Sequence, residues 1–309
     1  MPCTSSSSSS RSACPSRERV LHDDDLRAYL ARLEVEVEPP SADALFRLHR
    51  AQVERVPYET VWLHLGERWT IDPTESVTRV ARRNRGGYCF HVNGAFSELL
   101  RALGYDVTRH VGGVHGDDGP TEDSMANHLV LSVAGLPNAD NPDGAWYVDA
   151  GLGDALHEPL PLRAGEYHQG PFTYRLAATP GEIADWRFTH DARGSFRAMS
   201  WRAAPAEIPA FEAQHTRLST APDSLFVQYL IVQRRDATGV DIMVGLGLRR
   251  VDETQSAVRV LTERADWFAA LHDQFGLRFD GIEPAALDRL WNAQLAAYRK
   301  AEADRAVAQ

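Results

Sequence analysis

The sequence has very few cysteines. Only three occur among its 309 residues, and two of these, Cys3 and Cys14, lie in a serine-rich leader. A disulfide framework, which needs several paired cysteines, is therefore not expected. The leader also lacks the apolar centre of a secretory signal, so we interpret residues 1–20 as a flexible tail and expect a cytoplasmic protein.

Long apolar runs and clustered positive charge are missing as well. No uninterrupted apolar stretch approaches the roughly 18 to 20 residues that span a bilayer, so no membrane-spanning helix is expected. The 33 Lys and Arg residues against 43 Asp and Glu give a net charge of −10, which would repel a phosphate backbone. Neither nucleic acid nor a membrane is an expected partner. The composition is that of a globular chain, long enough for about two or three structural units.

The first third of the chain has helical periodicity. Residues 23–33 are predicted to form a short helix, and Ser41 can cap a second helix that Pro57 ends. A third helix begins near Cys89, because apolar residues recur at i, i+3, i+4 and i+7 before Gly104.

After Tyr105 the pattern changes to short β-rich runs separated by turn residues. Helices first and strands later favour an α+β fold over alternating βαβ units. The predicted strands cover residues 107–114, 128–133, 146–149, 172–176, 225–233, 240–248 and 257–261, and an amphipathic helix covers residues 285–299.

Two of these runs read as a hairpin that would place a histidine beside an aspartate. If Leu131 faces Trp146 across the hairpin, then His128 faces Asp149. Opposed residues in an antiparallel ladder have Cα atoms roughly 4.5 to 5.5 Å apart, close enough for an imidazole to bond a carboxylate. The register is assumed, so it establishes compatibility only.

Together with the cysteine near the third helix start, these two residues suggest a catalytic triad. A thiol nucleophile needs a base and a carboxylate that orients the base, and Cys89, His128 and Asp149 suit those roles. The positive end of the helix dipole favours a thiolate over a thiol at Cys89. The expected reaction is a double displacement, in which the cysteine takes an acyl group from a thioester and passes it to an amine.

The segment Arg85-Gly86-Gly87-Tyr88-Cys89-Phe90 resembles the nucleophile signature of the arylamine N-acetyltransferase family. Other segments resemble the family in the same order, specifically from about Leu45 to Leu162 and more generally beyond. These segments are Val56-Pro57-Tyr58-Glu59, Asn127-His128-Leu129 and Val148-Asp149-Ala150-Gly151-Leu152-Gly153.

The resemblance implies an α+β architecture of three units, with coenzyme A entering between them. The implied units are an N-terminal helical bundle over residues 21–104, a central β-barrel over 105–215 and a C-terminal α/β lid over 216–300, followed by a polar tail over 301–309. It also implies acetyl-CoA as acyl-donor co-substrate, no metal, and a small-molecule arylamine, arylhydrazine or related acceptor in a ping-pong mechanism.

The resemblance assigns further residues as well. Tyr58 and Leu152 correspond to family positions that line the acceptor pocket, although the family usually has an aromatic residue at the second position. Arg85 is expected to pair with a buried Glu59 as structural support. Gly151 and Gly153 could permit close approach of the cofactor, or simply form a turn.

Other polar residues have two interpretations each. His91, where the family usually has an acid, could be a proton partner behind the triad, but a histidine on the helix surface is the preferred interpretation. Arg79, Arg82 and Arg83 could attract the phosphates of coenzyme A or form a solvated face.

Competing functions use the same residue types. A zinc site from Cys89, His91 and His110 or His115 is disfavoured, because structural zinc commonly uses paired cysteines. The related amide synthases, which release a polyketide chain as a macrolactam, share the triad and are the main alternative. A thiol hydrolase would lack the Arg-Gly-Gly lead-in to the cysteine, and a non-catalytic binding protein should have lost part of the triad.

Overall fold

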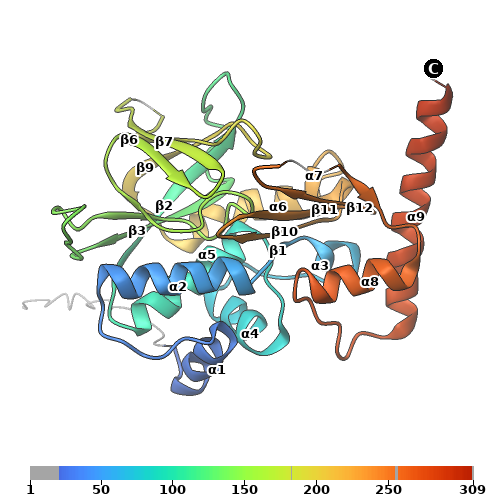
Figure 1. Cartoon of the computed structure of the whole chain (residues 1–309), viewed down its shortest axis with the longest axis horizontal. Coiled ribbons are helices and arrows are strands. Elements are labelled where there is room, and N and C mark those ends of the chain that lie inside the picture. Colours follow the sequence, from blue (N-terminus) through green and yellow to red (C-terminus); the bar gives the residue numbers. More distant parts are fainter. Residues whose placement is uncertain (1–20, 182, 255–256, 308–309) are drawn as a thin grey trace, which may run out of the picture.

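The computed structural model describes residues 21–181, 183–254 and 257–307, so the predicted leader lies outside the described part of the chain. Helices from the first third lie beneath a curved sheet, and a second sheet with two further helices lies beside them (Figure 1). This order of helices, barrel and mixed C-terminal elements confirms the predicted α+β class.

Three of the N-terminal helices begin and end where local signals in the sequence predict, and the helices over residues 61–64 and 73–83 were not predicted. Ser41 caps the second helix, since its Oγ accepts a hydrogen bond of 3.1 Å from Ala44 N. Asp72 caps the fourth in the same way, followed by Pro73 at the first helical position. The helices are α1 (Asp23–Leu33), α2 (Ala42–Arg55), α3 (Val61–His64), α4 (Pro73–Arg83) and α5 (Cys89–Ala102).

Eight antiparallel strands form the central sheet, which curls into a nearly closed barrel (Figure 1). Their order is β5-β4-β3-β2-β9-β8-β7-β6, and aromatic rings fill the interior, with Tyr147 and Trp201 stacked 4.8 Å apart. The strands are β2 (Asp106–His115), β3 (His128–Ala134), β4 (Trp146–Val148), β5 (Leu160–Pro161), β6 (Gly165–Gln169), β7 (Phe172–Ala178), β8 (Trp186–Thr189) and β9 (Ala198–Pro205).

The C-terminal part contains a five-stranded sheet of order β1-β10-β11-β12-β13. Its first strand, β1 (Tyr58–Glu59), comes from the N-terminal part and pairs with β10. The remaining elements are η1 (Ile208–Phe211), α6 (Glu212–Thr220), α7 (Leu225–Gln228), β10 (Ile231–Asp236), β11 (Gly239–Val244), β12 (Gly247–Val251), β13 (Arg259–Val260), α8 (Arg264–Asp273) and α9 (Pro284–Val307).

Two predicted strands in this part are wrong in detail. Residues 225–228 form a helical turn, because Ser224 Oγ accepts from Phe226 N and starts α7 before the strand begins. The run over 240–248 is a hairpin, because Gly245 has a φ of +57° and reverses the chain between β11 and β12. The final helix is longer than predicted and includes the expected polar tail as far as residue 307.

The assumed hairpin register is also wrong, by two residues. Leu131 faces Val148 rather than Trp146, because Leu136 N bonds Gly144 O at 3.0 Å and closes the loop further along the chain. A shift of two residues keeps every side chain on its original face of the sheet. His128 and Asp149 therefore still share a face, as diagonal rather than directly opposed neighbours.

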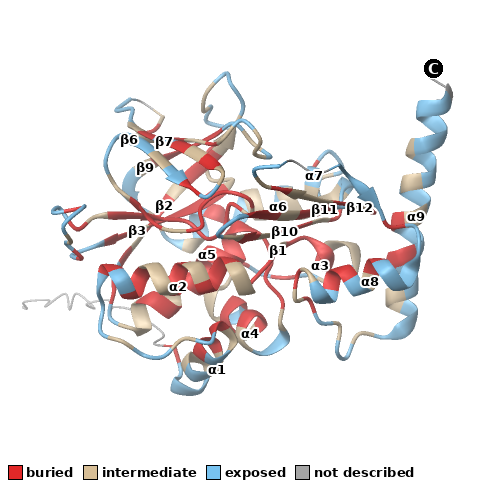
Figure 2. Cartoon of the chain, viewed as in Figure 1, coloured by how far each residue is buried: buried red, intermediate tan, exposed pale blue. Residues whose placement is uncertain are grey.

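Helix α5 is buried over almost its whole length, between α4 and the barrel (Figure 2). Eleven of its fourteen residues are buried, including Asn93 and Phe96. By contrast, the last turns of α9 are exposed and project from the molecule. Because α5 is enclosed, its first residue, Cys89, cannot shift without disturbing the core.

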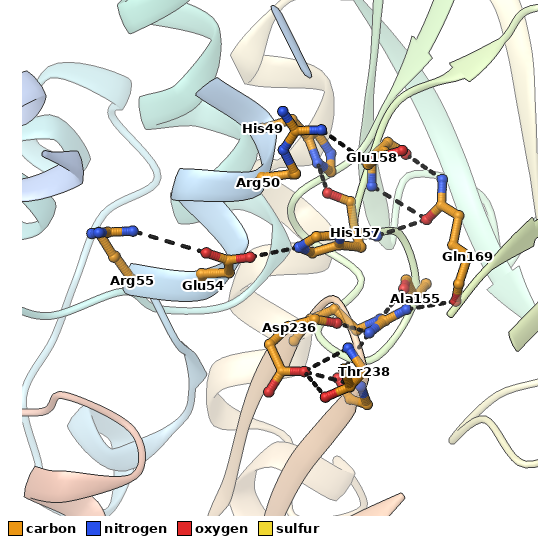
Figure 3. A network of polar contacts seen from close by, with 12 residues as sticks. His49, Arg50, Glu54, Arg55, Ala155, His157, Glu158, Gln169, Asp236 and Thr238 are labelled. Atoms are coloured by element: carbon orange, nitrogen blue, oxygen red, sulfur yellow. Dashed lines mark hydrogen bonds and ion pairs between the residues drawn. The ribbon is translucent and has the colours of Figure 1, made fainter. Parts of the chain in front are cut away.

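A polar network joins α2, the loop after β4, strand β6 and the β10–β11 hairpin (Figure 3). In this network, His157 Nε2 lies 2.7 Å from Glu54 Oε1, and its carbonyl oxygen lies 3.0 Å from His49 Nδ1. The buried guanidinium of Arg235 donates to the carbonyls of Ala155, Gln169 and Gly239, at 3.0, 2.9 and 2.8 Å. The network therefore fixes the loop after β4 against α2 and against the β10–β11 hairpin.

We expect Arg235→Met to lower the free energy of unfolding by about 2 to 4 kcal/mol, because buried carbonyls lose their donor. Urea denaturation followed by circular dichroism measures the change. Arg175→Met is the matched control, since Arg175 is 68% exposed and pairs with Glu166 on the surface. Its cost should stay below about 1 kcal/mol. Equal losses in the two variants would contradict the role given to Arg235.

Candidate active site

Cys89 is the first residue of α5, and two glycines bring it there. A Cβ on Gly86 would lie 1.8 Å from the carbonyl oxygen of Pro57, so only glycine fits. Gly87 has a φ of +103°, in the left-handed region that favours glycine. Cys89 Sγ donates a long hydrogen bond of 3.6 Å to the carbonyl of Asn127. The thiol therefore lies at a helix N-terminus, next to the residue that precedes His128.

His128 and Asp149 contact each other in the barrel wall facing this cysteine. His128 Nε2 lies 2.8 Å from Asp149 Oδ2, and both side chains are almost fully buried. The remaining oxygen, Oδ1, accepts 3.1 Å from Gly151 N and 2.7 Å from Asn93 Nδ2. Sequence reasoning thus named two residues that the fold brings together, although it assumed the wrong register.

Two residues around Asp149 were missed in the sequence. Asn93 Nδ2 also donates to Leu129 O, and its Oδ1 accepts from Ala150 N at 3.0 Å. Tyr147 donates its hydroxyl to Asp149 Oδ2 at 3.0 Å. Asn93 stands one helical turn after Cys89, and a polar residue at that spacing on an otherwise apolar helix was the available signal.

An open cleft of about 430 Å³ lies over the thiol. Its lining includes Cys89, His128, Gly151 and both expected pocket residues, Tyr58 and Leu152. The opposite walls come from the C-terminal sheet, α7 and the loop before β9. A volume in this range holds a small molecule or the arm of a larger one.

The glycines after Asp149 pack against protein in this structure. A Cβ on Gly151 would lie 2.8 Å from Asn93 Nδ2 and 3.0 Å from the Cα of Cys89. Gly153 has a φ of +73°, and its Cβ would lie 2.0 Å from Gln233 Oε1. Both glycines therefore allow the loop after β4 to approach α5 and β10 closely.

Glu59 and Arg85 form a buried ion pair below the site. Arg85 Nε donates 3.0 Å to Glu59 Oε1, whose other oxygen accepts from Val61 N at 2.7 Å. The guanidinium also lies over the Trp69 ring, 5.0 Å from its centroid. Arg85 directly precedes the two glycines. Its contacts with Glu59 and Trp69 therefore fix the path by which the chain reaches Cys89.

Comparisons with known proteins identify the family of the chain. The model of the N-acetyltransferase family matches residues 41–283. The chain belongs to this family. The pineal gland isozyme of arylamine N-acetyltransferase from Gallus gallus is 27% identical over 250 residues, covering 74% of this chain and 83% of that protein.

Solved structures share the fold of this N-acetyltransferase family member. Arylamine N-acetyltransferase from Nocardia farcinica superposes with a TM-score of 0.76 at 27% identity, covering 91% of this chain and 100% of that chain. The Mycobacterium marinum arylamine N-acetyltransferase, solved in complex with CoA, has the same fold with a TM-score of 0.75 at 24% identity, covering 87% of this chain and 98% of that one.

His91 contradicts the preferred interpretation, which was a histidine on the helix surface. It is fully buried rather than on the helix surface, because the rings of Trp62, Trp69, Tyr88 and His215 enclose it. Burial, and next the charge of Arg79, hold the pKa of His91 well below 6.5, so this imidazole is neutral.

The three arginines before the nucleophile differ in their surroundings. Arg79 is buried over the Trp69 ring, whereas Arg82 pairs with Asp25 at 2.7 Å. Arg83 is exposed and lies away from the cleft over the thiol. Within the described residues, no group of three or more His, Cys, Asp or Glu side chains is placed to hold a metal ion, and no helix is long and apolar enough to cross a membrane.

His128 of this family member is held in its charged form at neutral pH. Burial is the largest influence and lowers the pKa of His128, but the Asp149 carboxylate and then Cys89 raise it, from 6.5 to about 10 overall. An imidazolium beside the thiol stabilises the thiolate, the nucleophilic form of cysteine. Because the folded-state pKa exceeds the unfolded value, this protonation stabilises the fold fully below pH 6.5, and the contribution disappears as the pH rises to about 10.

We expect Asp149→Asn to lower the pKa of His128 well below about 10, because burial remains while the carboxylate is lost. NMR titration of the histidine ring measures this pKa directly. In the unsubstituted protein, the free energy of unfolding should decline between pH 6.5 and 10 because of His128. Urea denaturation of Asp149→Asn over the same pH range should no longer show this decline. An unchanged pKa of His128 would remove Asp149 as its main partner.

Proposed function

We propose that this chain is an arylamine N-acetyltransferase that moves an acetyl group from acetyl-CoA to an aromatic amine. One observation carries the proposal: a cysteine at a helix N-terminus opens into a cleft beside a histidine that is bonded to a buried carboxylate. These are the parts that thiol acyl transfer needs. The names of the related proteins support the choice of acetyl donor and amine acceptor.

The reaction divides into two displacements. The Cys89 thiolate attacks the thioester carbonyl carbon, the bond from that carbon to the coenzyme sulfur breaks, and His128 gives its proton to the leaving thiolate. In the second step the amine nitrogen attacks the acyl-cysteine, His128 accepts the amine proton, and the Cys89 thiolate leaves. Asp149 holds one imidazole tautomer throughout and balances the charge of imidazolium.

The other site residues that the family resemblance assigns lie in or next to the cleft. Tyr58 and Leu152 line the same cleft as the thiol and would contact the acceptor. Gly151 lines the cleft and would lie against the donor, whereas Gly153 packs against Gln233. The division into a helical unit over 21–104, a barrel over 105–215 and a lid over 216–300 is part of this proposal, although helix α6 crosses the boundary at 215.

Acetyl-CoA alone should leave an acetyl thioester on Cys89. Attack needs only the donor, whereas discharge needs an amine, so the intermediate should accumulate. Intact-protein and peptide mass spectrometry locate the adduct, and an arylamine added afterwards should remove it. Cys89→Ala is the control and should show no adduct with an unchanged circular dichroism spectrum.

The outcomes separate the rival functions. An adduct from long or carrier-bound thioesters, but not from acetyl-CoA, would replace the proposal with an amide synthase. The absence of an adduct with every thioester would reject acyl transfer and favour a hydrolase or a binding protein.

Leu152→Phe should shift acceptor preference toward flat aromatic amines. An added ring supplies a stacking surface worth about 0.5 to 1.5 kcal/mol. The ratio of kcat/KM for an arylamine to that for an aliphatic amine measures the shift. A ratio that does not move would place Leu152 outside the acceptor pocket.

A further inference from the structure

Three arginines gather where the N-terminal helices meet the C-terminal sheet. Arg32 lies in the last turn of α1, Arg234 lies on β10, and Arg278 follows α8. Gln233 lines the cleft over Cys89, and side chains alternate along a strand, so Arg234 points to the opposite face of the sheet. This arginine cluster is therefore separate from the candidate active site.

Two members of the arginine cluster converge on an open spot beside Gly276. Apart from the neighbours of the glycine in the chain, the described atoms nearest to a Cβ on Gly276 would be Arg32 Nη2 and Arg234 Nη1, each at 3.9 Å. Burial is the largest influence on the pKa of Arg32 and lowers it, and the charges of Arg278 and Arg234 are among those that lower it further. The three guanidiniums therefore repel one another across a small volume.

The two converging arginines have no acidic partner. In the described part of the chain, Arg32 makes one side-chain hydrogen bond, 2.6 Å to the carbonyl of Arg55, and Arg234 makes no ion pair or side-chain hydrogen bond. Arg278 lies 4.0 Å from Asp280, whose side chain is 86% exposed. Guanidiniums stay charged in proteins, so the arginine cluster holds uncompensated positive charge in a chain whose net charge is −10.

Nearby carboxylates do not supply the missing charge. Three of them influence the pKa of Arg234, and each already contacts another basic side chain. They are Asp236 and Asp241, at 2.9 and 3.3 Å from Arg250, and Glu54, at 2.7 Å from His157. Turning any of them toward Arg234 would break an existing contact. An anion from outside the chain would balance the arginine cluster without that loss.

We infer that Arg32, Arg234 and Arg278 form a binding site for a phosphoryl group. A phosphate combines negative charge with several acceptor oxygens, and the planar fork of a guanidinium can donate to two of them at once. The source would be free phosphate or the phosphate end of a nucleotide. Because the three arginines come from α1, from β10 and from the segment after α8, the bound anion would hold these elements together.

Thermal unfolding of the full chain, followed by circular dichroism, tests the site. At pH 7 and constant ionic strength, replacing chloride by inorganic phosphate should raise Tm in a saturable way, by roughly 5 °C. Isothermal titration should show one phosphate bound per chain. The same titration with ADP distinguishes a nucleotide from free phosphate as the source.

Arg234→Gln should abolish both the rise in Tm and the binding of phosphate. In phosphate-free buffer this variant should be at least as stable as the unsubstituted protein, because it removes a repelling charge and no hydrogen bond. Arg234→Lys keeps the charge and should retain part of the response. Arg249→Gln is the matched control, since Arg249 lies on the cleft side of the same sheet, and it should respond as the unsubstituted protein does.

The inference is overturned if phosphate raises the Tm of Arg234→Gln as much as that of the unsubstituted protein. It is also overturned if Arg249→Gln alone loses the response, because the anion would then lie in the cleft. Binding of ADP but not of phosphate, lost in Arg234→Gln, would support the site and identify a nucleotide as its ligand.

Discussion

The carboxylate of Asp149 is the group on which fold and chemistry both depend. It is 1% exposed, and removing a charge from water costs several kcal/mol unless its oxygens are fully bonded. Its four donors come from β3, α5, β4 and the loop that follows it. The barrel, the nucleophile helix and the cleft wall must therefore be assembled together for this charge to be tolerated. The same four contacts leave His128 aimed at Cys89.

Local signals in the sequence predicted the helix starts and the pairing of His128 with that carboxylate, but not its contacts with Asn93 and Tyr147. Ser41, the glycines before Cys89 and the helical periodicity after it act over a few residues, so they specify helix starts whatever the distant chain does. The predicted contact between His128 and Asp149 is correct although the predicted register was wrong by two residues, because strand side chains alternate with a period of two. The family resemblance supplied the barrel, which periodicity alone did not distinguish from other α+β arrangements.

Features that depend on distant neighbours were not predictable in this way. His91 is buried by rings from α3, from α6 and from Tyr88 just before α5, and nothing within its own helix indicates that enclosure. Residues 225–228 are apolar enough for a strand, but a cap at Ser224 makes them helical and places them at the cleft mouth.

The short strand β1 has a consequence for how the chain folds as it is made. Its two residues, Tyr58 and Glu59, leave the ribosome early but pair with β10, which is synthesised long afterwards. Contacts between segments so far apart slow folding, because the intervening chain must be ordered first. Until β10, β11 and β12 have been made, the wall that they supply to the cleft is missing, and the thiol of Cys89 stays open to solvent and oxidants. The cleft is thus completed only after most of the chain has been made.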